Sequence, residues 1–335
     1  MRIETAGYQG SIAEAIAQAT EAQEAGYDTW WATETKSDVF LSAAAAASQA
    51  GEIRVGTGIA VALARNPMLV AVQANDIQAF SGGRFSLGLG AQVKPHVERR
   101  FSMEYSSPAA RMREFVLAVR AIWKAWEESS PLDFQGDFYT HTLMTPMFDP
   151  GPNPHGNPPV QMAAVGPLMT EAAGEVADGV AVHGFCTERY LREVQLPAIE
   201  RGRKKAGKGL EGFEINSPGF VVAGDTEEEI AGGVALVKAQ LGFYGSTPAY
   251  RPVLELEGWG ELGEELTRLS KSDGWGAMPE LIDDEVLAAF TVIGTPEEAG
   301  AELRERYGDV ATRVVLASGQ VTAQQRERFA SALNA

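Results

Sequence analysis

The chain has 335 residues, 45% of them hydrophobic, and a formal net charge of −17 at pH 7. The length suits one large α/β domain or two ordinary ones, and the apolar content is sufficient for a sizeable core. The acidic balance argues against nucleic acid or an anionic membrane as a partner, because both bind basic faces.

The cysteine content and the N-terminal stretch bear on the compartment in which the protein works. Cys186 is the one cysteine, which excludes an intrachain disulfide and favours a reducing compartment. The opening stretch MRIETAGYQGS lacks the basic and then apolar pattern of a signal peptide. We therefore expect a cytoplasmic protein whose partner is a small-molecule substrate.

Short apolar runs alternate along the chain with segments of helical period. The predicted strands are Met1–Ala6, Thr29–Thr33, Ile53–Leu63, Phe85–Leu89, Val160–Val165, Val180–Val182, Glu214–Ala223 and Thr312–Ala317. Helices are predicted over 11–26, 39–49, 67–80, 112–126, 169–176 and 187–206, and two more begin at Thr226 and Thr295. Eight such units, with strands apolar on both faces, predict an α/β fold, the (β/α)8 TIM barrel, with a doubly wound sheet as the alternative.

Two stretches interrupt this alternation inside what we expect to be a single domain, 1–335. Residues 130–159, after the fourth strand, contain a predicted hairpin and a Pro- and Gly-rich loop. Residues 242–292, after the seventh strand, are rich in Tyr, Trp and Gly. Long insertions of this kind form lids or binding loops, or pack a subunit interface.

In a barrel the loops that follow the strands build the active site. Glu34 directly ends the second strand and can bind a ring or act as an acid or base, unless its loop only caps a helix. Thr57, Gly58 and Ile59 stand in the third strand, where glycine permits close approach to the backbone. The structural alternative there is a β-bulge that packs the barrel.

The fourth strand leads into RFSLGLGAQVKPHVERRF, residues 84–101. A Rossmann fingerprint requires G-x-G-x-x-G in the first βα unit, but Val93 replaces the third glycine and three strands precede it. We expect instead that a flat ligand approaches the backbone here, with Gln92, Lys94 and His96 around it. Arg99 and Arg100 are also consistent with a solvated helix face.

After the fifth strand, Val165 and Gly166 lead into a helix that Pro167 starts well. Free backbone N–H groups and the helix dipole make such a turn a phosphate site, although a well-formed corner has the same sequence. His183 ends the sixth strand and can donate to the same anion, or be a satisfied core histidine. The four histidines lack metal-ligand spacing, so no metal site is expected.

Four motifs in this order resemble the luciferase-like monooxygenase superfamily over nearly the whole chain: EAGYDTWWATE, VGTGIAVALARNP, SGGRFSLGLGAQ and VQMAAVGPLMTEAAGEVADG. The likeness is closest to the branch of oxidoreductases that use coenzyme F-420, a deazaflavin. LGLGAQVKPHVERRF followed by SPAARMREFVLAVRAIW is typical of one subgroup of that branch.

The resemblance implies a cofactor site. It implies a non-prolyl cis peptide bond at Gly58–Ile59 against the middle ring of the cofactor, and contact of Glu34 with the polar edge of the ring. The other residues that it implies around the cofactor are Thr57, Gly90, Ala91, Gln92 and Lys94 beside the ring, and Ala164, Val165, Gly166 and Pro167 at the phosphate. An oligoglutamate tail would account for a basic patch on an acidic protein.

The chain departs from the sugar-phosphate dehydrogenases of the family, which carry a histidine at Thr35 and a glutamate at Ala91. A proton carrier must therefore come from Glu34, His96, His183 or His141. The predicted activity is hydride transfer between C5 of coenzyme F-420 and a small organic substrate. The alternatives are an FMN-dependent monooxygenase served by a separate reductase and a barrel that binds flavin without catalysis; a homodimer is a family expectation.

Overall fold

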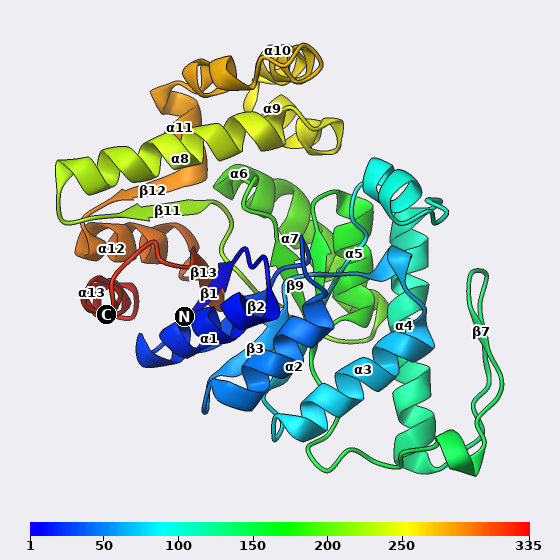
Figure 1. Cartoon of the computed structure of the whole chain (residues 1–335). Helices are drawn as coiled ribbons and strands as arrows, with labels where there is room; N and C mark the ends of the chain where they lie inside the picture. The colour runs from blue at the N-terminus through cyan, green and yellow to red at the C-terminus, as the bar shows by residue number, and fades with distance from the viewer.

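A closed barrel of parallel strands forms the centre of the computed structural model, which describes all residues from Met1 to Ala335 (Figure 1). The strands of the barrel are β1 (Arg2–Gly7), β2 (Thr29–Ala32), β3 (Arg54–Thr57), β5 (Phe85–Gly90), β8 (Val160–Ala164), β9 (Gly179–Val182), β10 (Glu214–Ile215) and β13 (Arg313–Ala317). Their order is β10-β9-β8-β5-β3-β2-β1-β13, and a parallel bridge between Asn216 and Arg313 closes the ring. The predicted (β/α)8 barrel is confirmed, and the doubly wound sheet is excluded.

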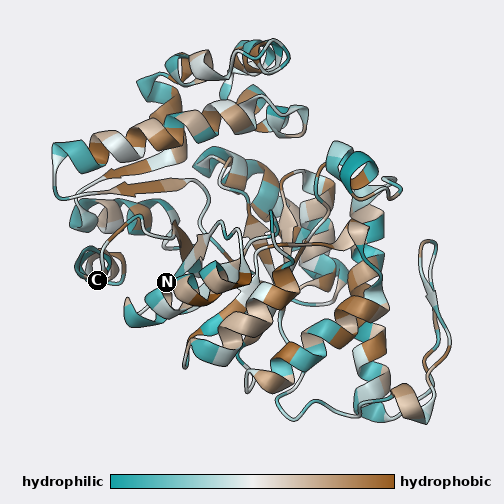
Figure 2. Cartoon of the chain, viewed as in Figure 1, coloured by the Kyte–Doolittle hydropathy of each residue, from teal (hydrophilic) through white to brown (hydrophobic).

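Helices cover the outside of the barrel, and hydrophobic and hydrophilic residues alternate along them (Figure 2). They are α1 (Ile12–Glu24), α2 (Val39–Gln49), α3 (Pro67–Phe80), α4 (Pro108–Glu128), α5 (Pro167–Val176), α6 (Glu188–Tyr190), α7 (Leu196–Lys205), α12 (Pro296–Tyr307) and α13 (Ala323–Leu333). The first three begin where Ser11, Asp38 and Asn66 accept hydrogen bonds from backbone N–H groups of the first turn. No helix is long and apolar enough to cross a membrane.

The lower part of the barrel interior is filled by a buried ionic layer. Arg313 donates to Glu4 at 3.1 Å and to Gln161 at 3.0 Å, and all three side chains are buried. The indole N–H of Trp31 donates to the same oxygen of Glu4, Oε2, at 2.8 Å. Because Arg313 and Gln161 lie at or next to the amino ends of β13 and β8, this layer fills that end of the barrel, and any opening lies at the carboxyl ends.

The predicted seventh strand, Glu214–Ala223, is wrong as a single element. Only β10 belongs to the barrel, and β11 (Phe220–Ala223) leaves it to pair with β12 (Thr291–Gly294), which the sequence did not predict. Pro218 has no N–H to donate, and Gly219 has a φ of +79°. These two residues turn the chain out of the barrel between two strand-like runs.

The insertion at 130–159 does not cover the carboxyl ends of the strands, so its predicted role as a lid there is wrong. Its hairpin is confirmed, with β6 (Phe134–Gln135) antiparallel to β7 (Thr140–His141), and it runs alongside α4 (Figure 1). The loop that follows lies at the amino end of β5, where Pro159 accepts from the Leu87 N–H. The physical reason is the helix α4, whose 21 residues carry the chain about 30 Å to the opposite end of the barrel.

The second insertion lies at the other end of the molecule. It begins in the last turn of α8 (Glu227–Gly245) and contains α9 (Arg251–Glu257), α10 (Gly260–Ser270) and α11 (Asp284–Phe290). These helices stand above β11 and β12 (Figure 1). Tyr244 and Tyr250 of this segment pack on His183, the residue that follows β9. The segment 242–292 therefore contacts the carboxyl end of the barrel.

Candidate functional site

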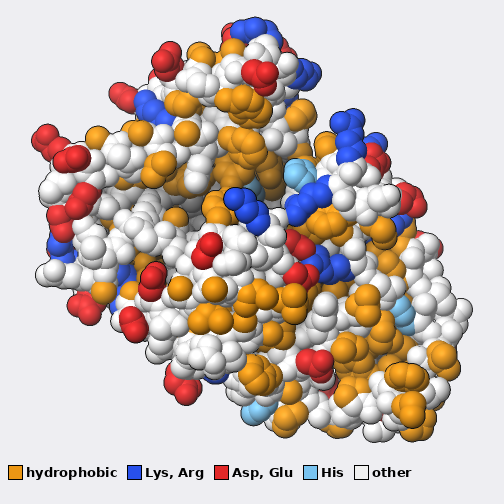
Figure 3. All heavy atoms as spheres, viewed as in Figure 1, with side chains coloured by type: hydrophobic (Ala, Val, Ile, Leu, Met, Phe, Trp, Pro, Cys, Tyr) orange, Lys and Arg blue, Asp and Glu red, His pale blue; other side chains and the backbone are white.

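The mouth of the barrel, where the strands end, is open above Trp31. Side chains alternate along a strand, so the positions two residues above the buried ionic layer also face inward. These positions carry small side chains that remain partly exposed, namely Ala6, Ala163, Ala181 and Val315. The space-filling view shows the molecule hollowed between the segment above β11–β12 and the barrel (Figure 3).

One cis peptide bond occurs in the chain, between Gly58 and Ile59, at the position that the resemblance implies. A Cβ at Gly58 would lie 2.9 Å from Trp31 Cβ, and one at Gly90 would lie 2.7 Å from Ile59 Cδ1. Gly58 thus lets the chain pass close to Trp31, and Gly90 lets the side chain of Ile59 pack against β5. Ile59 itself is partly exposed at the mouth.

Thr57 has a different role from the predicted one. Its buried hydroxyl donates to Gly88 O and accepts from Gly88 N, both at 2.8 Å. The side chain is therefore used within the barrel wall, where it joins β3 to β5, and does not reach the mouth.

The turn before α5 leaves backbone N–H groups of the first helical turn without a side-chain partner. No side chain caps this helix, unlike α1, α2 and α3, and a Cβ placed at Gly166 would have nothing within 4 Å. The buried amide of Gln195 donates to the carbonyl oxygens of Ala164 at 3.3 Å and Val165 at 3.2 Å, which holds the end of β8. Together with Pro167, which starts the helix, this turn has the geometry of a phosphate site.

A basic turn follows β5. Gln92 has a φ of +61°, and the chain then forms the short helical turn His96–Arg100. Lys94 is 62% exposed and pairs with Glu98 at 3.6 Å, and His96 is also exposed. Lys and Arg side chains gather beside the hollow on the face shown in Figure 3. Ala91, just before this turn, is partly exposed at the strand end.

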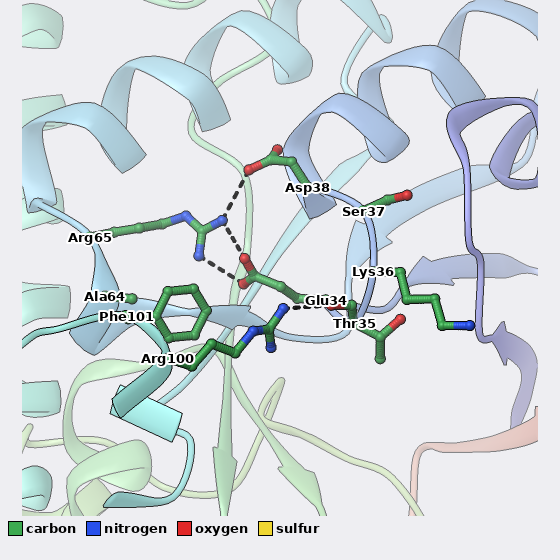
Figure 4. Close-up of a pocket in the computed structure, with 9 residues that line it drawn as sticks. All are labelled: Glu34, Thr35, Lys36, Ser37, Asp38, Ala64, Arg65, Arg100 and Phe101. Atoms are coloured by element: carbon green, nitrogen blue, oxygen red, sulfur yellow. Dashed lines mark hydrogen bonds and ion pairs between the residues drawn. The ribbon is translucent and has the colours of Figure 1, made fainter. Parts of the chain in front are cut away.

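Glu34 lies in a pocket of about 330 Å³ at the edge of the mouth, lined by the loop after β2, by Ala64 and Arg65, and by Arg100 and Phe101 (Figure 4). Its two oxygens accept from Arg65 at 2.6 and 2.7 Å, and Oε2 also accepts from the Val61 N–H at 2.6 Å. Arg100 donates to the carbonyl oxygen of Thr35 at 2.6 Å, which ties the basic turn to the same loop. The structure therefore brings Glu34 to the mouth, but as one half of an ion pair.

His183 lies on another side of the mouth, within an aromatic cluster. Its ring stacks on Tyr250 with centroids 4.6 Å apart, and meets Tyr244 edge-on at the same distance. Nδ1 accepts from the Phe185 N–H at 2.9 Å, so the remaining proton of the neutral ring is on Nε2, 3.4 Å from the Tyr250 hydroxyl. Burial lowers the pKa of His183 to about 4, so the ring is neutral at pH 7.

Sequence reasoning missed Tyr244 and Tyr250 as neighbours of His183. The signal was present as the Tyr-rich run GFYGSTPAY within the insertion. It did not say which strand end those rings would cover. The structure shows no cluster of three or more potential metal ligands anywhere in the chain.

The chain is similar to proteins of known and unknown activity. It is 48% identical over 310 residues, 91% of each chain, to an uncharacterized protein of Mycobacterium tuberculosis. It is 27% identical over 304 residues to 5,10-methylenetetrahydromethanopterin reductase of Archaeoglobus fulgidus, covering 89% of this chain and 87% of the relative.

Solved structures with a similar fold include a protein of the same kind as the relative from Archaeoglobus fulgidus. The coenzyme F-420-dependent tetrahydromethanopterin reductase of Methanopyrus kandleri superposes with a TM-score of 0.81 at 21% identity, over 99% of this chain and 98% of the other. The family model described as luciferase-like monooxygenase matches residues 1–313. The barrel, its open mouth and these matches show that the chain belongs to the luciferase-like monooxygenase family.

Proposed function

We propose that the protein is an oxidoreductase that binds coenzyme F-420 and transfers a hydride between C5 of the deazaflavin and a small organic substrate. The relative from Archaeoglobus fulgidus is a methylenetetrahydromethanopterin reductase, and the superposed enzyme of Methanopyrus kandleri is coenzyme F-420-dependent. Their activities are compatible with the chemistry that the residues at the mouth of this barrel can support.

The residues present fit such a cofactor. The small inward-facing side chains above Trp31 leave room for a flat ring beside Ile59 and Gly90. The uncapped turn at Gly166 offers N–H groups to a phosphate, and the space above Gly166 is clear. The bound cofactor would supply the hydride, and the barrel would supply binding, orientation and exclusion of water.

The observation that carries the choice of coenzyme F-420 is the basic turn on an otherwise acidic chain. The net charge is −17, yet three cations, Lys94, Arg99 and Arg100, lie within one stretch of seven residues after β5. Lys36, in the loop after β2, lines the same pocket as Arg100. Lys94 has only a distant partner, Glu98 at 3.6 Å. An oligoglutamate tail would satisfy these cations, whereas FMN has no such tail.

Proton handling is assigned to His183 in this proposal. Glu34 has its carboxylate engaged by Arg65 and Val61, and His96 is exposed on the basic turn. His183, neutral and protonated on Nε2, can donate a hydrogen bond to a carbonyl oxygen of the substrate. Tyr250, whose pKa is raised by burial, would remain protonated beside it and support the same bond.

An FMN-dependent monooxygenase is the second candidate, because the matching family model is described as luciferase-like monooxygenase and the α5 turn would hold the phosphate of either cofactor. Separate titrations of the purified protein with coenzyme F-420 and with FMN distinguish the two, with tryptophan quenching as the readout. Trp31 lies directly below the proposed ring position and is a suitable reporter. Tighter binding of FMN would overturn the proposal, and substrate turnover would exclude a non-catalytic barrel.

The tail contact is tested by Lys94→Ala. We expect this change to weaken binding of the tail-bearing cofactor several-fold and to leave the tailless precursor unaffected, because one cation is lost from the patch. Lys124→Ala is the matched control, since Lys124 is 68% exposed and pairs with Glu128 at 3.9 Å with the same i,i+4 spacing on α4. An equal loss of affinity for both cofactor forms would contradict the role given to Lys94.

A further inference from the structure

The pair formed by Glu34 and Arg65 joins two loops at the mouth of the barrel. The guanidinium of Arg65 binds both oxygens of Glu34, at 2.6 and 2.7 Å, and also reaches Asp38 at 3.1 Å (Figure 4). The side chain of Glu34 is 7% exposed and that of Arg65 is 14% exposed. A bidentate pair with so little exposure to solvent is geometrically specific, because the planar guanidinium matches the carboxylate in only a few orientations.

Both side chains also bind the backbone of Val61. The Val61 N–H donates to Glu34 Oε2 at 2.6 Å, and the Val61 carbonyl oxygen accepts from Arg65 Nη1 at 3.2 Å. The two backbone groups of this residue are therefore held by the two halves of one ion pair. No other contact of Glu34 or Arg65 is as well suited to fix a segment of the chain.

Val61 is two residues from Ile59, the residue at the rim of the mouth. It belongs to β4 (Ala60–Val61), a strand of two residues that pairs with Leu89 and Gly90 of β5. So short a strand contributes few ladder hydrogen bonds of its own. The position of Ile59 against Gly90 thus depends on what holds Val61 from the opposite side.

We infer that Glu34 and Arg65 are positioning residues that set the place of the segment 58–61 at the mouth, and that Glu34 does not carry a proton in the reaction. This differs from the catalytic role that the sequence predicts for Glu34. The effect on the cofactor rests on the proposed function, since the segment would form one side of the ring site. The effect on the segment itself does not depend on any cofactor.

Two conservative substitutions test the inference. Arg65→Lys keeps the charge but loses the bidentate contact, and Glu34→Gln places an amide N–H2 opposite the guanidinium or the Val61 N–H. Arg113→Lys is the matched control, because Arg113 forms a bidentate pair with Glu175 between α4 and α5, at 2.8 and 2.5 Å. All four proteins are compared by amide hydrogen exchange over residues 58–65 without cofactor, and by titration with coenzyme F-420.

We expect Arg65→Lys and Glu34→Gln to accelerate exchange in 58–65 and to weaken binding about tenfold, as loss of one charge-assisted hydrogen bond would. Arg113→Lys should leave both measurements at the wild-type value. Unchanged exchange and unchanged binding in Arg65→Lys would overturn the inference. A third measurement is the pH dependence of the reaction rate: if Glu34→Gln, but not Arg65→Lys, loses one limb of this profile, Glu34 carries a proton and the inference is also overturned. If the wild type does not bind coenzyme F-420, the proposed function fails. The positioning role is then decided by amide hydrogen exchange over residues 58–65 alone: faster exchange in the two variants supports it, and unchanged exchange overturns it.

Discussion

Protonation of His183 should destabilise the protein as the pH falls. The pKa of this side chain is lowered from 6.5 to about 4 by burial, so between these two values the unfolded chain binds a proton that the folded chain does not. Stability must therefore decrease as the pH falls from about 6.5 to about 4, and be insensitive to this group above and below that window.

The expected size follows from the same values. A difference of about 2.5 pH units at about 1.4 kcal/mol each gives an upper bound of about 3 to 4 kcal/mol, reduced in practice because the ring keeps some exposed surface. His183→Gln removes this term and also removes the stack on Tyr250, worth about 1 kcal/mol at every pH. The variant should therefore be less stable than the wild type at pH 7, and the difference should shrink or reverse by pH 4.5.

The assay is urea unfolding of both proteins at several pH values from 4 to 8, monitored by tryptophan fluorescence. Burial also lowers the pKa of His141, but that contribution is common to both proteins and cancels in the difference. His96→Gln is the control, since it removes a histidine from an exposed turn, and its profile should follow that of the wild type. A stability difference between wild type and His183→Gln that is the same at pH 4.5 and pH 7 would refute the reasoning.

Two further substitutions test the barrel wall and the hairpin. Gly88→Ala would place a Cβ 1.9 Å from the backbone oxygen of Thr57, so we expect the free energy of unfolding, measured with a chemical denaturant, to fall by at least about 3 kcal/mol. Gly166→Ala is the control: its Cβ would have nothing within 4 Å, so the variant should keep wild-type stability. Glu114, buried on α4, accepts from the N–H groups of residues 137, 138 and 139 at 2.7 to 2.9 Å. Glu114→Ala should cost about 3 kcal/mol and open the hairpin to proteolysis, and a weakened cofactor affinity would contradict our placement of the hairpin away from the mouth.

Local patterns in the sequence were sufficient for the architecture. Alternation of apolar runs with helical periods predicted the barrel, because parallel strands buried on both faces need no tertiary information to be recognised. The start of α1 at Ser11 and of α12 at Thr295 followed from capping side chains, whose contacts span three or four residues. The glycines at 58 and 90 lie where side-chain atoms of Trp31 and Ile59 come close to the backbone, and the approach of a ligand there stays a prediction.

Contacts between distant parts of the chain were decided by the tertiary structure. Glu34 was predicted to bind a ring or to act as an acid or base at a strand end. Its partner Arg65 lies 31 residues further on, and the two meet only because the segments that follow β2 and β4 come together in the folded barrel. His183 meets Tyr250 for the same reason, across 67 residues.

By itself, then, the sequence determined the barrel and the end at which its site would lie, since these depend on the period of apolar residues along short segments and on the order of strands and helices. The folded barrel decided which polar side chains at that end bind one another and which remain available, because ion pairs and ring stacks form between segments that are neighbours only in space.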